Sequence, residues 1–141
     1  MNNSICVVGA GYFTPWLGSV LIKAAKGEPI TIYNSESKFN NIVDLLEIQR
    51  FISWISDREF SGFDSINLAA NEPITIRKVA DLIVSLTGSK SKIIEQNTNK
   101  KSFSIATEKI NQIFGFIPTS TKKIICRYVE QNKTDLSKYK V

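Results

Sequence analysis

The residues of this sequence that are best placed to do chemistry are two glycines near its start. Gly9-Ala10-Gly11 follows an apolar, β-branched stretch, residues 4–8, which predicts a buried strand. A strand, Gly-x-Gly and a helix form the pattern that brings backbone N–H groups close to a pyrophosphate, and Glu36 lies in the window for a ribose-binding carboxylate. One interpretation is therefore a small self-contained dinucleotide-binding domain built on Gly9-Ala10-Gly11.

The same motif departs from that pattern at its third small residue. Thr14 stands where Gly or Ala would let the helix close on the strand, and Pro15 and the bulky Trp16 follow it. Under the other interpretation, Gly9 and Gly11 only turn the chain at the end of a strand. Both interpretations require glycine at these positions, so both stay open on the residues alone.

Composition excludes several chemistries. Histidine is absent, so the chain contains no Ser-His-Asp or Cys-His machinery and no His-ligated zinc, and we expect no metal site. Cys6 lies in Ile5-Cys6-Val7 and Cys126 in Ile125-Cys126-Arg127, each next to apolar residues, so we expect buried, reduced thiols.

Length and charge predict one compact unit with an anionic partner. The chain has 141 residues, 43% hydrophobic and 22% charged, with a net charge of +5 from 18 Lys and Arg against 13 Asp and Glu. Aromatic residues do not interleave with the basic ones, so we expect no nucleic acid as a partner. The alternative to an anionic partner is a solvated basic face.

No apolar run reaches the ~18 residues of a membrane span and no secretory signal is visible, so we expect a cytoplasmic protein without membrane contact.

Strands and helices alternate along the chain, which predicts an α/β fold. The helix after Asp44 should bury Leu45, Ile48, Ile52 and Ile55. We expect a lobe over residues 1–131 and a polar tail over 132–141 that frays. Strands are predicted at residues 4–8, 30–33, 64–69 and 92–95, an extended piece at 39–43, and helices beginning near Trp16, Asp44, Thr75, Thr107 and Ser120 or Thr121.

Six short motifs occur in a specific order: Val7-Val8-Gly9-Ala10-Gly11, Gly27-Glu28-Pro29-Ile30-Thr31-Ile32-Tyr33-Asn34, Phe39-Asn40-Asn41-Ile42-Val43, Asn67-Leu68-Ala69-Ala70, Glu72-Pro73-Ile74-Thr75-Ile76-Arg77 and Gly115-Phe116-Ile117-Pro118. Over residues 4–131 this order resembles the C-terminal, substrate-binding part of the NAD-dependent epimerase/dehydratase family, the extended short-chain dehydrogenases that act on nucleotide sugars. The resemblance implies a small mixed α/β lobe that lacks the N-terminal Rossmann half and begins with a late strand of the cofactor domain.

The resemblance also implies what this chain lacks. The family's cofactor fingerprint and Tyr-x-x-x-Lys pair belong to its N-terminal half, and here Tyr12, Tyr33 and Tyr128 are followed four positions later by Trp16, Ser37 and Asn132. The chain is thus expected to bind a nucleotide sugar without catalysing alone, with no catalytic residue and no cofactor of its own. NAD is implied for the complete enzyme, and whether this chain is an enzyme stays open.

The implied substrate-binding residues lie on strands and basic loops. Thr31 and Tyr33 fall where a family strand presses on the nucleotide base, and Asn67 falls beside the nucleotide; the alternatives are a half-buried strand aromatic for Tyr33 and a backbone cap for Asn67. Asn40 and the stretch Gln96-Asn97-Thr98-Asn99 stand where the family has arginines that grip the diphosphate, which an amide cannot replace in charge. The remaining candidates are point cations that could equally be solvated: Lys38, Lys100 and Lys101.

Three functions therefore compete. The first is the lobe that binds a nucleotide diphosphate sugar within an epimerase or dehydratase. The second is the self-contained dinucleotide-binding domain. The third is a non-enzymatic interaction module that pairs with a Rossmann-domain partner or with itself, because a lobe without its partner domain exposes apolar surface.

Overall fold

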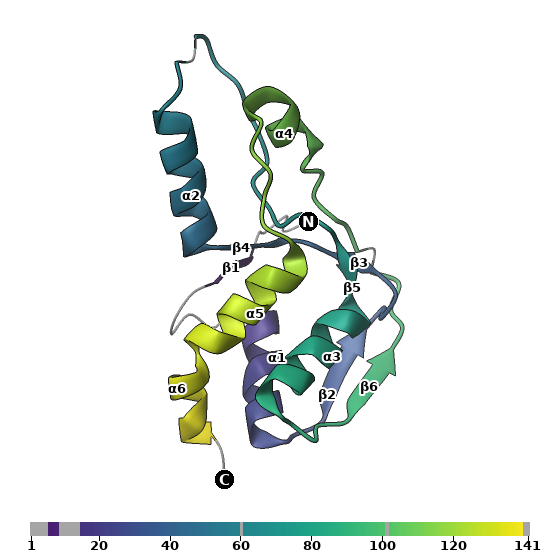
Figure 1. The fold of residues 1–141 in the computed structure, drawn as a ribbon. Coiled ribbons are helices and arrows are strands. Elements are labelled where there is room, and N and C mark those ends of the chain that lie inside the picture. The colour runs from purple at the N-terminus through teal and green to yellow at the C-terminus, as the bar shows by residue number, and fades with distance from the viewer. Residues whose placement is uncertain (1–5, 9–14, 60, 101, 140–141) are drawn as a thin grey trace.

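A computed structural model describes residues 6–8, 15–59, 61–100 and 102–139 (Figure 1). Helices and strands alternate over most of this length, as the sequence predicts, and the fold is mixed α/β. In chain order the elements are β1 (Cys6–Val8), α1 (Pro15–Lys26), β2 (Ile30–Tyr33), β3 (Lys38–Phe39), β4 (Ile42–Asp44), α2 (Leu45–Ser56), β5 (Ile74–Thr75), α3 (Ile76–Thr87), β6 (Ile93–Gln96), α4 (Glu108–Phe114), α5 (Thr121–Gln131), α6 (Lys133–Leu136) and the 3-10 turn η1 (Ser137–Tyr139).

The described strands pair two by two. β1 and β4 are parallel, β2 and β6 are parallel, and β3 and β5 are antiparallel. In the β2–β6 pair, Ile30 lies opposite Ile93 and Tyr33 lies opposite Gln96. Because the two strands run in the same direction and in this register, both end at the same edge, and the loops that follow them lie next to each other.

Short polar side chains begin three of the helices. Asp44 accepts a hydrogen bond from the N–H of Glu47 at 2.7 Å, Thr75 from Lys78 at 3.2 Å and Ser120 from Lys123 at 3.4 Å. These contacts confirm the predicted caps and select Ser120 over its neighbour, because a side-chain oxygen satisfies an N–H that has no partner inside the helix.

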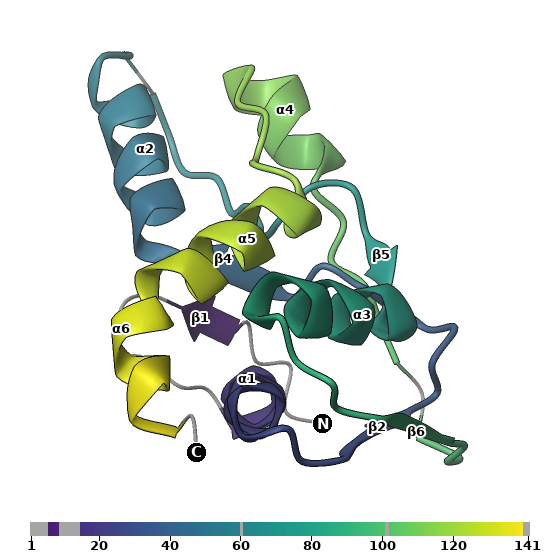
Figure 2. The same ribbon diagram turned by 60° about the horizontal axis from the view of Figure 1, so that its bottom comes forward.

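The main core lies between β2 and three helices. Figure 2 looks along α1 and shows α3 and α5 crossing over it, with β2 at the side. Helix α3 contacts both α1 and α5. The fully buried side chains come from all of these elements and include Leu17, Leu21, Ile30, Ile32, Val79, Ile83, Ile124, Ile125 and Tyr128.

A smaller aromatic cluster joins α2 to the segment after α4. Phe51 and Trp54 of α2 pack edge-to-face on Phe116 with ring centroids 5.1 and 6.0 Å apart, and Phe51 also meets Phe114 at 6.0 Å. The indole N–H of Trp54 donates to the carbonyl oxygen of Phe114 at 2.9 Å. Aromatic residues therefore fix the inner face of α2, which projects with α4 from one end of the molecule (Figure 1).

Four sequence-based predictions are wrong. Leu45 and Ile52, expected in the core, are 61% and 54% exposed, because α2 turns its aromatic side inward instead. Residues 64–69 form no strand, and Lys109 binds both the carboxylate of Asp64 and the carbonyl oxygen of Ser65 there at 2.6 Å.

The third concerns the end of the chain. Residues 133–139 do not fray: they form α6 and η1, with Leu136 buried against the core. The fourth is the burial of Cys126: its thiol is free, but the residue is partly exposed and not buried, whereas the side chain of Cys6 lies outside the described part of the chain.

A buried carboxylate ties α2 to the segment before α5. Glu47 has no exposed surface, and its oxygens accept hydrogen bonds from Arg50 at 2.7 Å and from the backbone N–H and hydroxyl of Thr119, each at 2.8 Å. Arg127 of α5 forms an ion pair with the equally buried Asp44 at 2.8 Å. Burial alone would raise the pKa of Glu47, but the hydrogen bonds from Arg50 and Thr119 outweigh it and hold the pKa below its ordinary value of 4.5.

We predict that Glu47→Gln lowers the free energy of unfolding by about 2–3 kcal/mol, less than for a fully buried pair because Arg50 remains partly exposed. Because the pKa of Glu47 is lowered in the folded state, its contribution is present above pH 4.5 and is lost as the pH falls through the folded-state value. Urea denaturation at pH 7 and over the acid range measures both effects.

The control for this prediction is Glu28→Gln, which removes a carboxylate whose ion pair with Lys26 is exposed and 3.8 Å long. We expect it to change stability by less than about 1 kcal/mol. Equal losses from the two substitutions would show that Glu47 does not have the role assigned to it.

Candidate functional site

A groove of about 510 Å³ lies at the carboxyl ends of β2 and β6. Clefts beside the carboxyl ends of parallel strands are common ligand sites, because the loops that leave the strands there can surround a bound molecule. The lining residues come from the end of β2, the start of α3 and the loop after β6: Tyr33, Asn34, Ile76, Thr98, Lys100 and Ser102.

Alternation along β2 explains why the tyrosine is available. Ile30 and Ile32 face the core and are buried, so Thr31 and Tyr33 lie on the opposite face of the strand. Thr31 is partly buried, and Tyr33, at the strand end, is 50% exposed. A half-exposed aromatic ring on the wall of a groove offers a flat apolar surface to a ligand.

Asn34 joins the two loops. Its backbone N–H donates to the carbonyl oxygen of Gln96 at 2.8 Å, which extends the β2–β6 pairing. Its side-chain oxygen accepts from the N–H of Thr98 at 2.8 Å, and its amide nitrogen donates to the Thr98 hydroxyl at 3.2 Å and to the carbonyl oxygen of Lys100 at 2.9 Å.

The start of α3 is already occupied by protein contacts. The N–H groups of Ile76 and Arg77 donate to the carbonyl oxygens of Ser37 and Ser35, both at 2.9 Å. The guanidinium of Arg77 binds Asp81 at 3.0 Å and also Glu95. Hydrogen bonds from Ser35 and from Arg77 lower the pKa of Glu95. Within the described part of the chain, Lys100 is therefore the cation that lines this groove.

Asn40 has a structural role in the folded chain. It is buried, and its amide nitrogen donates to the carbonyl oxygens of Ala70 at 2.9 Å and Ile105 at 2.8 Å, while its oxygen accepts from the N–H of Ile105 at 2.7 Å. This side chain thus holds two backbone segments together.

The other expected site residues lie in different places. Asn67 is exposed and does not line the groove. Lys38 is exposed at the start of β3, and its carbonyl oxygen accepts from the Ser102 hydroxyl at 3.5 Å, so its backbone lies beside the groove. Lys101 and Gly9-Ala10-Gly11 lie outside the described residues, so their predicted roles stay predictions.

Four groove residues were not identified from the sequence: Asn34, Ile76, Thr98 and Ser102. Asn34 and Thr98 could have been found from the sequence, since each is a small polar residue within three positions of the end of a predicted strand. What the sequence did not show is that these two strands pair with each other.

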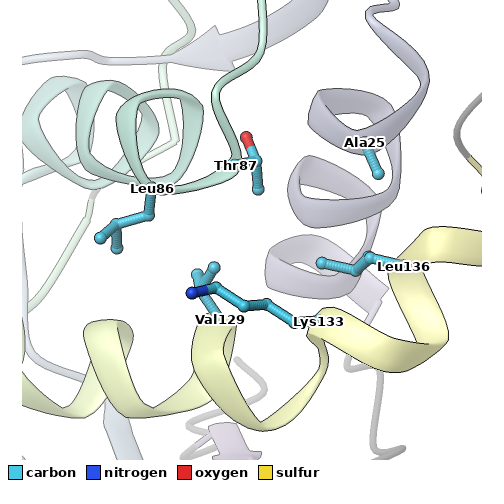
Figure 3. A pocket seen from close by; sticks show the side chains of 6 residues that line it. All are labelled: Ala25, Leu86, Thr87, Val129, Lys133 and Leu136. Atoms are coloured by element: carbon cyan, nitrogen blue, oxygen red, sulfur yellow. The ribbon is translucent and has the colours of Figure 1, made fainter.

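A second cavity, of about 140 Å³, lies between α1, α3, α5 and α6. Figure 3 shows its mostly apolar lining, with the Lys133 side chain lying across Val129; the ammonium group of Lys133 pairs with Glu130. With its small volume and mostly apolar lining, this cavity is a small gap in helix packing. Among the residues that the structure describes, no His, Cys, Asp and Glu side chains gather into a group that could hold a metal ion. Nor does any helix there have the length and apolar character needed to cross a membrane.

The fold is shared with part of several epimerases and dehydratases of known structure. An epimerase from Methanothermobacter thermautotrophicus matches with a TM-score of 0.75 and 15% identity over 94% of this chain and 42% of that one. UDP-glucose 4-epimerase from Thermotoga maritima, solved with UDP-glucose, matches with a TM-score of 0.71 and 17% identity over 92% and 44%. The dTDP-glucose 4,6-dehydratase of Bacillus anthracis, solved with NAD, matches with a TM-score of 0.71 and 17% identity over 94% of this chain and 43% of that one.

No family model matches the sequence, and no curated protein matches it. At such low identities the likeness establishes the fold alone: this chain has the small mixed α/β fold of the C-terminal part of these epimerases, as the resemblance implied. The chain spans less than half the length of each of the three enzymes.

Proposed function

We propose that the groove at the ends of β2 and β6 binds the nucleoside diphosphate part of a nucleotide sugar. The observation that carries this proposal is that Tyr33 and Lys100, far apart in the sequence, line the same groove. Its volume of about 510 Å³ lies within the range of roughly 300–1,000 Å³ found for small-molecule sites.

The lining offers one group for each part of such a ligand. An aromatic ring such as that of Tyr33 stacks on the face of a nucleobase. The Lys100 ammonium attracts phosphate as a point charge, and the hydroxyls of Thr98 and Ser102 can donate hydrogen bonds to phosphate or ribose oxygens. The Thermotoga enzyme, which has the same fold, was solved with UDP-glucose, which supports this ligand class.

The role of this chain is binding rather than hydride transfer. No tyrosine in the sequence has a lysine four positions later, so the acid–base pair of the resembling family is missing from these residues. The Bacillus enzyme was solved with NAD, and we propose that NAD serves a complete protein in which this lobe holds the sugar nucleotide. Because residues 9–14 are not described, the dinucleotide-cradle alternative at Gly9 stays a prediction.

Phosphate is held here by a different group than in an arginine-based site. Asn40 is committed to backbone partners and Arg77 to carboxylates, which leaves Lys100 as the cation on the described wall. A lysine makes no bidentate fork with phosphate, so most of the affinity should come from stacking on the ring.

We predict that UDP binds the chain and that Tyr33→Ala weakens this binding about tenfold or more, because a base stacked on an aromatic side chain gains about 1–3 kcal/mol. Tyr33→Phe should retain most of the affinity, since it keeps the ring. Isothermal titration with UDP, dTDP and NAD measures these affinities.

The lysine is tested in the same titrations. Lys100→Gln should weaken UDP binding several-fold and reduce its salt dependence, whereas Lys90→Gln, at an exposed lysine outside the groove, should change neither. Tight binding of NAD with no response to UDP or dTDP, or equal affinity in the Tyr33→Ala variant, would contradict the proposal.

A second candidate function is the docking of a Rossmann-type α/β domain. Leu45, Leu46 and Ile52 on α2 are 61%, 48% and 54% exposed. Strands β1 and β4 form a pair of parallel strands, an arrangement that normally belongs to a larger sheet covered by helices. Because the chain spans less than half of the enzymes that share its fold, a domain of the Rossmann type is the occupant that fits this face.

We predict that the chain without such a partner associates with itself as its concentration rises, because an uncovered apolar helix face gains free energy by burial. Analytical ultracentrifugation measures the mass in solution. The double variant Leu45→Lys, Ile52→Lys should sediment as a monomer, and Ile94→Lys, at an exposed position on β6, should associate like the parent chain. A parent chain that stays monomeric at every concentration would count against this function.

A further inference from the structure

We propose that Asn34 is a positioning residue that holds residues 97–100 in place as one wall of the groove. The proposal deepens the proposed function and rests on it for its effect on nucleotide binding. The local backbone singles out this residue: Asn34 has a φ of +51°, in the left-handed region that asparagine tolerates better than most residues.

The Asn34 side chain binds the loop at three points. Its oxygen accepts from the N–H of Thr98, and its amide nitrogen donates to the hydroxyl of Thr98 and to the carbonyl oxygen of Lys100, at 2.8, 3.2 and 2.9 Å. An amide can do this because it carries an acceptor and two donors on one planar group. The contacts join segments more than 60 residues apart in the sequence.

Little else in the described structure fixes this loop. Residues 97–100 are all exposed, so no apolar side chain anchors them in the core. The remaining bonds are weak or local: the N–H of Lys100 approaches the Thr98 hydroxyl at 3.4 Å, and the Ser102 hydroxyl approaches the carbonyl oxygen of Lys38 at 3.5 Å. The position of the loop therefore depends on the Asn34 amide.

This dependence matters because Asn34 follows Tyr33 directly. The same turn carries the aromatic ring and holds Thr98 and Lys100, all of which line the groove. A ligand that contacts both the ring and the lysine needs the two at a fixed separation, and a loop that is ordered beforehand spares the ligand the entropy of ordering it. We therefore infer that Asn34 sets the nucleotide affinity without being a main contact of the nucleotide.

Amide hydrogen exchange tests the positioning directly. Asn34→Gly removes the side chain while keeping a residue that adopts a positive φ freely. We expect the Thr98 amide to exchange about fivefold to tenfold faster in this variant, as for the loss of one hydrogen bond, with the amides of α1 and α3 unchanged. Unchanged exchange at Thr98 would overturn the inference, whether or not a nucleotide binds.

Titration with UDP tests the consequence for binding. Asn34→Asp keeps the acceptor oxygen but loses both donated hydrogen bonds, and Asn97→Asp adds the same charge to the same loop at an exposed position outside the groove lining. We expect Asn34→Asp to raise the Kd for UDP about tenfold and Asn97→Asp to raise it less than threefold, with the thermal midpoint of both near that of the parent.

The outcomes separate the two proposals. If the parent chain binds UDP and the two aspartate variants bind it equally, the inference about Asn34 fails while the proposed function stands. If the parent chain does not bind UDP, the proposed function fails, and the exchange of the Thr98 amide alone decides whether Asn34 positions the loop.

Discussion

The parallel pairing of β2 with β6 is the constraint on which the groove depends. In-register pairing from Ile30 to Tyr33 brings the carboxyl ends of both strands to one edge, so two loops distant in the sequence leave the sheet together. An aromatic residue that ends one strand then faces polar and basic residues that follow the other. Without this pairing, Tyr33 and Lys100 would be ordinary exposed side chains on unrelated turns.

Two side-chain amides, those of Asn34 and Asn40, join segments that are distant in the sequence. Asn40 is buried and binds the backbone at residues 70 and 105, whereas Asn34 is on the surface and binds the backbone at residues 98 and 100. Both use the donor and acceptor of one planar group to connect strands to loops. The difference is burial: the first contact stabilises the fold, and the second shapes a groove that solvent and ligands can reach.

Helix α2 shows how strongly tertiary packing can depart from sequence periodicity. Its apolar residues occur at helical spacing on more than one side. The aromatic side faces inward, because Phe51 and Trp54 are larger than leucine or isoleucine and pack against Phe116. Buried Glu47 fixes the same orientation through Arg50 and Thr119. The aliphatic side is thereby left outward and exposed.

The sequence by itself determined helices α1 to α5, the caps of three of them and most of the strands, because periodicity, Asp44, Thr75 and the polar residue before α5 act over a few neighbouring residues. It also predicted an α/β fold and, through a resemblance, the class of structure that the comparisons confirm. The same resemblance made Tyr33 and Lys100 candidate site residues, although the sequence did not show that they line one groove.

Only the tertiary structure decided which elements pair, which face of α2 is buried, that residues 64–69 form no strand, and that Asn40 faces the interior. It also identified Asn34, whose importance depends on Thr98 and Lys100 lying beside it. The physical reason is the same in each case: caps and periodicity are local, whereas burial and long-range hydrogen bonds depend on which of several similar surfaces find a complementary neighbour once the chain has folded.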